Sequence, residues 1–381
     1  GRKSKIMVKY YNYIYIRIGY VYWKEGVQMK RTKCIIGMIL LGMEVGLFTF
    51  SGCGSNQTDL SLAEGMQYIE RLDYQSALAA FQTAEKNGED ERLTERGLGI
   101  VYMGLTNYDS AIESFLQCLS LSDGIVEEMD YDVNFYLAAA YQKAGKYNEA
   151  EKVYDAILAM RPQDIDAYYL RGNARLSQDK YETAKEDFNK EIVLEPYNFG
   201  RLIEIYEVLS AHGYKQIGEE YLETALSQRD AKMTALDKGK INYYLCKYEQ
   251  AQVFLEDAKS TGEAEAFLYL GMAYEATGDY NYAIKNVYTS YLNRNKENPQ
   301  IYNQLGLCYM KQEDYSSALS AFQSAMQIAD NEMIQALQFN EIVAYEFLGE
   351  YTQAAVLLGN YIKMYPDDEA ARREYGFLST R

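Results

Sequence analysis

The chain has 381 residues, a net charge of −17 at pH 7 and a single histidine, His212. One histidine cannot form a histidine-rich metal site or serve a paired nucleophile, and we interpret it as a turn residue beside Gly213. The acidic balance argues against nucleic acid as a partner, because the phosphates would be repelled.

The first segment, residues 1–28, precedes a sequence that is typical of the beginning of a secretory signal peptide. A secretory signal has its basic region next to the initiator, and Met29-Lys30-Arg31-Thr32-Lys33 supplies such a region. Lys24-Glu25-Gly26 can also be encoded by purine-rich codons that contain a ribosome-binding sequence. We therefore expect 1–28 to result from an upstream mis-start.

The second segment, residues 29–52, continues with a largely apolar run from Cys34 to Phe50 and ends in Ser51-Gly52-Cys53. This pattern resembles a bacterial lipoprotein signal peptide. The resemblance implies that Cys53 becomes the first mature residue and carries lipid on its thiol, with 53–57 as a short tether. The alternatives are an uncleaved transmembrane anchor or a buried helix, and Glu44 argues more strongly against a spanning helix than against a transient signal.

Removal of residues 1–52 would make the chain more acidic. These residues hold nine Lys or Arg and two Asp or Glu, which leaves 29 basic and 53 acidic residues and a net charge of −24. Such a domain should be repelled by an anionic leaflet, so membrane attachment would depend on acyl chains. No other cofactor is expected.

From residue 58 onward, small residues return at intervals near 34. One series is Gly65, Gly99, Ala138, Gly172, Tyr206, Gly239, Gly271, Gly306 and Ile342, with Tyr206 and Ile342 as exceptions. A second series, twelve residues further on, is Ala77, Ala111, Ala150, Ala184, Gly218, Ala251, Ala283, Ala318 and Ala354. A tyrosine stands three residues before each member of the second series except Gly218. Spacings of three and four residues indicate helices, and a 34-residue period indicates stacked helical hairpins.

Glycine and proline occur where hairpins require them. Gly145, Gly213, Gly278 and Gly349 lie at the predicted turns between paired helices, where a positive φ is needed. The four prolines lie between the predicted repeats.

Asp73 to Phe81 (DYQSALAAF) and Asp314 to Phe322 (DYSSALSAF) resemble the second helix of a tetratricopeptide repeat (TPR). The resemblance implies an all-α fold, a right-handed α-solenoid of about nine TPR hairpins within 58–366, followed by a capping helix at 367–381. The expected repeats are 58–91, 92–125, 131–164, 165–198, 199–231, 232–263, 264–297, 299–332 and 335–366. Single hairpins would be too short to be stable alone, so stacking must bury their apolar faces.

No catalytic constellation stands out, so we expect no enzyme activity and no metal site. Three cysteines follow Cys53, namely Cys118, Cys246 and Cys308, and we interpret all three as small core residues. Acidic residues are abundant but form no distinct pair. An envelope enzyme remains possible only if such a pair exists.

The TPR resemblance implies a ligand groove lined by the first helix of each hairpin. The residues we place there are Met103, Phe135, Tyr169, Asn173, Leu176, Glu207, Met233, Tyr243, Tyr244, Met272, Asn303 and Met310. Asn173 matches an asparagine that peptide-binding relatives use, whereas Tyr169 stands where such relatives carry a carboxylate-binding lysine. The alternative is that these side chains pack the first helices against one another.

The groove positions are rich in acidic residues. The groove positions hold eight acidic residues (Asp59, Glu70, Asp132, Asp166, Glu207, Glu265, Glu275 and Glu346) and only four basic ones (Arg96, Lys143, Lys240 and Lys311). We therefore expect a basic or amphipathic protein or peptide partner and no small-molecule substrate. The first hypothesis for function is a lipid-anchored, extracytoplasmic adaptor of the bacterial cell envelope that uses this groove. The alternative is a cytoplasmic TPR regulator whose apparent signal is accidental or an uncleaved anchor.

Overall fold

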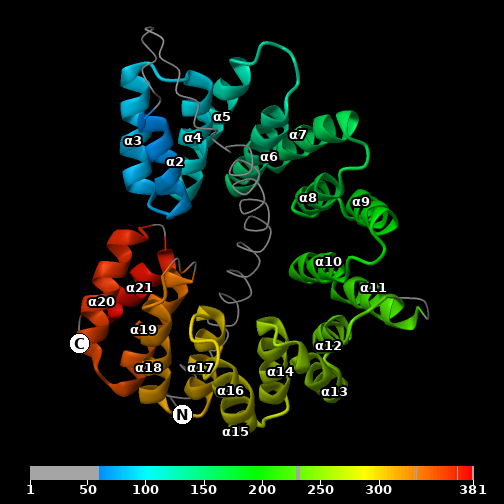
Figure 1. Ribbon diagram of the computed structural model, residues 1–381, viewed down its shortest axis with the longest axis vertical. Coiled ribbons are helices and arrows are strands. Elements are labelled where there is room, and N and C mark those ends of the chain that lie inside the picture. Colours follow the sequence, from blue (N-terminus) through cyan, green and yellow to red (C-terminus); the bar gives the residue numbers. More distant parts are fainter. Residues whose placement is uncertain (1–59, 229–231, 330, 332, 367, 380–381) are drawn as a thin grey trace, which may run out of the picture. The chain divides into compact units, whose positions relative to one another are not determined.

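The computed structural model describes residues 60–228, 232–329, 331, 333–366 and 368–379. Within these ranges the chain is an all-α solenoid of successive helix pairs and contains no strand (Figure 1). The described residues divide into two compact units, which meet between Gly218 and Glu219. The predicted start, signal and tether at 1–57, Cys53 included, lie outside the described residues.

The first unit covers residues 60–218. Its helices are α2 (Leu60–Glu70), α3 (Tyr74–Asn87), α4 (Glu91–Gly104), α5 (Tyr108–Ser120), α6 (Glu128–Lys143), α7 (Tyr147–Met160), α8 (Ile165–Leu176), α9 (Tyr181–Leu194), α10 (Phe199–Ala211) and the start of α11 (Lys215–Ser227).

The second unit contains the rest of α11 and all later helices. These are α12 (Ala235–Tyr244), α13 (Tyr248–Ala258), η1 (Lys259–Thr261), α14 (Ala264–Ala276), α15 (Tyr280–Tyr282), η2 (Ala283–Tyr288), α16 (Thr289–Leu292), α17 (Pro299–Lys311), α18 (Tyr315–Met326), α19 (Ile334–Leu348), α20 (Tyr351–Met364) and α21 (Glu369–Leu378). Each pair begins within three residues of a repeat expected from the sequence.

The turn between paired helices requires one residue in the left-handed region. Gly145, Gly213, Gly278 and Gly349 have φ between 73° and 88°, which confirms the sequence interpretation. The other five turns place side-chain-bearing residues there, with φ between 57° and 62°: Leu72, Thr106, Asp179, Cys246 and Glu313. The next residue in several turns is an Asp or Asn that caps the second helix, as when Asp314 accepts from the Ser317 amide at 3.1 Å.

Small residues on the first helices allow an aromatic ring of the same repeat to pack against the backbone. A Cβ on Gly306 would lie 2.4 Å from Phe322, and one on Gly99 would lie 2.3 Å from Phe115. Phe81 and Phe188 cover Gly65 and Gly172 in the same way. The glycine in the first series is therefore a packing residue, because any side chain would displace a buried ring.

The second helix of the seventh repeat is interrupted by a π-helical turn, η2. This turn adds a residue, and the buried Tyr288 then covers Gly271 while its hydroxyl donates to Glu275 at 2.5 Å. The only feature of the sequence that accompanies this turn is a repeat length of 35 residues, from Gly271 to Gly306.

The C-terminal helix, α21, buries Ala371 and Leu378 and exposes Arg372 and Arg373. The buried side of α21 thus joins the apolar core that α20 contributes to, as Leu358 and Tyr361 show. Among the described residues, no helix combines the length and the apolar character needed to cross a membrane.

Candidate functional site

Five of the predicted groove residues are buried. Tyr169 is fully buried, and Asn173, Leu176, Asn303 and Met310 are between 1% and 8% exposed. Asn303 accepts a hydrogen bond from Asn340 Nδ2 at 2.8 Å, which joins α17 to α19. Burial of these side chains supports the packing alternative at these positions and gives no support for direct contact with a ligand.

The other predicted groove residues are half-buried. They are Met103, Phe135, Glu207, Met233, Tyr243, Tyr244 and Met272. The first three belong to the first unit and the last four to the second. Each unit therefore has its own partly accessible first-helix face.

In the second unit, this face carries Tyr243, Tyr244 and Tyr269, and Tyr248 at the start of α13 packs beside them; we call these four residues the tyrosine cluster. The ring of Tyr243 meets those of Tyr244, Tyr248 and Tyr269 edge-on, with centroids 5.5–5.8 Å apart. The hydroxyls of Tyr244 and Tyr269 are 3.1 Å apart. Rings that are half-buried and mutually supported offer a rigid amphipathic contact area at a low entropic cost.

Three of the acids expected to line a groove are already paired between repeats. Arg96 Nε lies 2.7 Å from Asp132, and Lys240 lies 2.5 Å from Glu265. Lys311 lies 2.7 Å from the buried Glu275. These pairs join adjacent first helices, so these acids add little net charge for a ligand.

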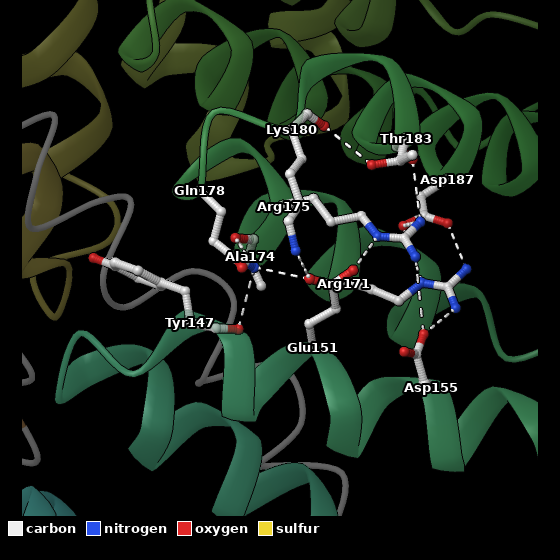
Figure 2. A network of polar contacts seen from close by, with 10 residues as sticks. All are labelled: Tyr147, Glu151, Asp155, Arg171, Ala174, Arg175, Gln178, Lys180, Thr183 and Asp187. Carbon is white, nitrogen blue, oxygen red and sulfur yellow. Dashed lines mark hydrogen bonds and ion pairs between the residues drawn. The ribbon is translucent and has the colours of Figure 1, made fainter.

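A second set of charges fills the space between α7, α8 and α9 (Figure 2). Asp187, with a side chain 3% exposed, accepts from Arg171 at 2.6 Å and from Arg175 at 2.9 Å. Arg171 also meets Asp155 at 2.7 Å, and Arg175 meets Glu151 at 2.8 Å. We call this set the α7–α9 charge network. Because its members satisfy one another, the network is a packing device and not an open site.

Glu151 completes the network from α7. Burial tends to raise its pKa, but hydrogen bonds from Lys180, Arg175 and Gln178 outweigh that effect and lower the pKa to about 2. Lys180 and Gln178 approach one of its oxygens at 2.8 and 2.9 Å. The carboxylate is therefore held ionised.

A third set surrounds Arg201 at the start of α10. Its guanidinium lies 2.5 Å from Asp166 and 3.1 Å from each of Glu191 and Glu204. The same group stands 4.4 Å from the ring centre of Tyr169. We call these residues the Arg201 cluster. One cation here serves three carboxylates, unlike the paired acids above.

Glu191 is the buried member of the Arg201 cluster. Its side chain is 2% exposed, and neither oxygen receives a hydrogen bond of good geometry, although Arg201 Nε is nearby. Burial raises the pKa of Glu191 to about 8, and Asp166, Glu204 and Glu195 add to the rise while Arg201 opposes it. Glu191 is therefore protonated at neutral pH.

The thiols give a mixed result against the sequence interpretation. Cys118 and Cys308 are buried, as expected, whereas Cys246 is exposed in a left-handed turn, so its assignment to the core was wrong. Burial raises the pKa of the Cys118 thiol to about 11 and raises that of Cys308 as well. In the described part of the chain, His, Cys, Asp and Glu form no group suited to a metal ion.

Sequence reasoning missed both buried charge sets, although the repeat pattern contained the signal. Arg171 stands directly before Gly172, where four other repeats have leucine. Asp187 and Glu191 occupy second-helix positions that other repeats fill mostly with small or apolar residues. A charge at a core position of one repeat alone is the feature that should have drawn attention.

Four family models match the chain, and all describe tetratricopeptide repeats. They match residues 102–174, 165–196, 265–297 and 299–332. The chain therefore contains tetratricopeptide repeats in both units.

Two curated relatives match over part of their length. The chain is 28% identical over 181 residues to FK506-binding protein 59 of Drosophila melanogaster, covering 46% of the chain and 41% of that protein. It is 25% identical over 219 residues to the DnaJ homolog subfamily C member 7 homolog of Dictyostelium discoideum, covering 58% of the chain and 38% of that protein. The chain thus spans about two fifths of these relatives.

Solved structures are similar at low identity. A tetratricopeptide repeat protein from Parabacteroides merdae aligns with a TM-score of 0.42 and 13% identity, over 76% of this chain and 99% of that one. MamA from Desulfovibrio magneticus aligns with a TM-score of 0.39 and 19% identity, over 45% of this chain and 94% of that one.

Proposed function

We propose that the chain is a non-catalytic scaffold that binds a peptide or protein segment on the first-helix faces of its repeats. The observation that carries this proposal is the tyrosine cluster on α12–α14, because half-buried aromatic rings are the side chains most enriched at protein interfaces. Met272 on α14 and Met233, which precedes α12, are also half-buried and add adaptable apolar contacts.

Other observations support recognition over chemistry. The buried thiols are held in the protonated form, and the α7–α9 charge network is internally satisfied. Neither offers an activated nucleophile. The repeats that the family models match are also a fold built around extended binding surfaces.

A photo-crosslinker can test which helix face binds. We would place p-benzoylphenylalanine at Tyr244 on α12 and, as the matched control, at Val253 on α13, which is 69% exposed. The proposal expects a discrete adduct from position 244 in cells and little from position 253. Equal adducts from both positions, or an adduct from 253 alone, would contradict a first-helix site.

We further propose that the scaffold is extracytoplasmic and anchored to the cell membrane by lipid on Cys53. This part rests on the signal-like sequence 29–53, since those residues lie outside the described ranges. A single test compares the chain with its Cys53→Ala variant for incorporation of an alkyne-tagged palmitate and for sedimentation with membranes.

The outcomes separate the alternatives. Loss of both label and sedimentation in Cys53→Ala supports the lipid anchor. Sedimentation without label in both forms would indicate an uncleaved anchor helix. If both forms remain unlabelled and do not sediment, the chain is better explained as a cytoplasmic TPR regulator.

A further inference from the structure

The Arg201 cluster differs from the other ion pairs of the first helices in its charge balance. Arg96 and Lys240 each form an ion pair with one carboxylate, Asp132 and Glu265 respectively. Arg201 instead serves Asp166, Glu191 and Glu204 at 2.5, 3.1 and 3.1 Å. Three carboxylates therefore share the guanidinium of Arg201.

Two members of the cluster are open to solvent. The side chains of Asp166 and Glu204 are 27% and 24% exposed, on α8 and α10. Glu191 lies beneath them on α9 and is 2% exposed. A cation arriving from solvent would therefore meet Asp166 and Glu204 first and would act on Glu191 through a short, poorly hydrated path.

Buried polar atoms around the cluster point to an unfinished site. The hydroxyl of Tyr169 and both oxygens of Glu191 are buried and have no hydrogen-bond partner. Burial raises the pKa of the Tyr169 hydroxyl well above its ordinary value. The negative charges of Glu204, Glu207 and Glu191 raise it further, whereas Arg201 opposes the rise. Such orphaned groups are uncommon in native proteins and call for a ligand or a change of charge.

The titratable and charged groups that face Glu191 come from three helices. Asp166 and Tyr169 lie on α8, and Arg201 and Glu204 on α10. Glu195 follows α9 at its C-terminal end. Asp166, Glu204 and Glu195 raise the pKa of Glu191 by their negative charge, whereas the Tyr169 hydroxyl stays neutral because its own pKa is raised. The three carboxylates therefore favour the proton on Glu191 until another positive charge arrives.

We propose that the Arg201 cluster binds a lysine or arginine side chain of the partner segment, and that Glu191 releases its proton to solvent as that cation binds. This inference rests on the proposed scaffold function and names the chemistry of its partner. The cation supplies the charge that ionised Glu191 lacks, so binding and deprotonation favour each other.

The direction of the pH dependence follows from this linkage. With a pKa near 8, Glu191 is about one-tenth ionised at pH 7 and about nine-tenths ionised at pH 9. If only the ionised form accepts the cation, the apparent affinity rises about tenfold over that interval. A lysine peptide remains largely protonated throughout, so the change reports on the protein.

The probe is acetylated hexalysine amide, titrated calorimetrically into the full chain between pH 7 and pH 9. Paired buffers of different ionisation enthalpy measure the protons released on binding. For the native chain we expect up to one proton released at pH 7 and affinity that rises about tenfold toward pH 9. Glu191→Gln, which keeps the size of the side chain, should show no release and a flat pH profile.

Two further variants keep the test decisive. Glu204→Gln on the exposed rim should weaken binding at every pH, whereas Glu182→Gln, an equal charge change on the exposed first turn of α9, should not. The proposal is overturned if hexalysine binds without proton release. It is also overturned if Glu204→Gln and Glu182→Gln behave alike, since that would indicate attraction by net charge alone.

The same experiment separates this inference from the scaffold function. A crosslink from Tyr244 together with no hexalysine binding would leave the scaffold standing and remove only the cation site. Hexalysine binding with proton release but no crosslinked partner would keep the cation site and contradict the wider scaffold proposal.

Discussion

The hairpins at α7–α10 and at α17–α20 follow one helix pattern but differ in the charged side chains that their cores contain. Between α17 and α20 the buried side chains are mainly apolar, including Phe322, Leu337, Val343 and Leu358. Between α7 and α10 apolar side chains such as Phe188 and Leu209 are buried as well, but Asp187 and Glu191 are buried among them beside arginines. The hairpin fold therefore does not require an apolar residue at each core position, provided that charges are paired.

This difference indicates which residues specify how the helices of a repeat protein align with one another. Apolar contacts are not directional and so tolerate more than one alignment, whereas Asp187 is satisfied by Arg171 and Arg175 in their present register. We interpret the α7–α9 charge network as a register lock, which costs desolvation and excludes misaligned stacking.

We expect the largest loss of stability when the α7–α9 charge network loses its central residue, Asp187. Asp187→Ala leaves Arg171 and Arg175 without their buried partner and should cost about 3–5 kcal/mol. Hydrogen exchange should localise the loss to α8 and α9. Replacing all three residues with the side chains typical of other repeats (Arg171→Leu, Arg175→Tyr, Asp187→Ala) should recover most of that stability. A triple variant as unstable as Asp187→Ala would show that the charges do more than satisfy each other.

An equally buried apolar side chain sharpens the comparison from the other side. Phe322 is fully buried over Gly306, and Phe322→Ala should cost about 3–5 kcal/mol because it leaves a cavity. Exchange protection should fall in α17 and α18. Phe377→Ala on α21, where the ring is 45% exposed, is the control and should change little. We expect no repacking of the neighbouring side chains to recover the stability that Phe322→Ala loses, in contrast to the triple variant above.

Two glutamates of the polar region should respond to pH with opposite sign. Glu151 has a lowered pKa of about 2, so its contribution is present above the unfolded value and is lost as pH falls below about 4.5. Glu191 has a raised pKa of about 8, so its protonated form is stabilising at low pH, and stability is lost as pH rises through 8.

Thermal unfolding across pH measures both effects. Glu151→Gln should be less stable than the native chain at pH 7, and the difference should shrink below pH 4.5 and disappear only as pH falls through about 2. Glu191→Gln should be more stable than the native chain at pH 9, by about 1–4 kcal/mol, and the gap should close toward pH 4.5. Parallel pH profiles for the two variants would contradict the assigned environments.

The sequence predicted the hairpins well because their signals are local. The turn glycines and the packing of Gly306 against Phe322 depend on residues within one repeat, and the period repeats these residues along the chain. The charge network also depends on partners from the preceding repeat, as when Arg171 on α8 meets Asp155 on α7. The repeat period does not specify which side chains pair between repeats, so sequence alone could flag Arg171 as unusual but could not assign Asp155 to it.

The candidate site was harder to predict for a related reason. Position in the repeat placed Tyr244 and Asn303 on the same kind of face, yet Tyr244 is half-buried and Asn303 is 1% exposed. The difference arises from the neighbouring helix, since Asn340 on α19 reaches Asn303. Exposure at a groove position is thus decided by the next repeat, which a single repeat does not encode.

The smallest effect concerns the turns, which differ between repeats within the second unit. Glu313 is held at φ 62° without the freedom of glycine, whereas Gly349 occupies the equivalent turn at φ 84°. Because a left-handed conformation costs a side-chain-bearing residue about 1–2 kcal/mol, Glu313→Gly should relieve strain, with a net gain of up to about 1 kcal/mol after the entropic cost of glycine. Gly349→Ala should lose about 1–2 kcal/mol for the same reason. Exchange rates of the turn amides in both variants measure the difference, and a Glu313→Gly variant that is less stable than the native chain would mean that the side chain holds the turn by contacts that outweigh its strain.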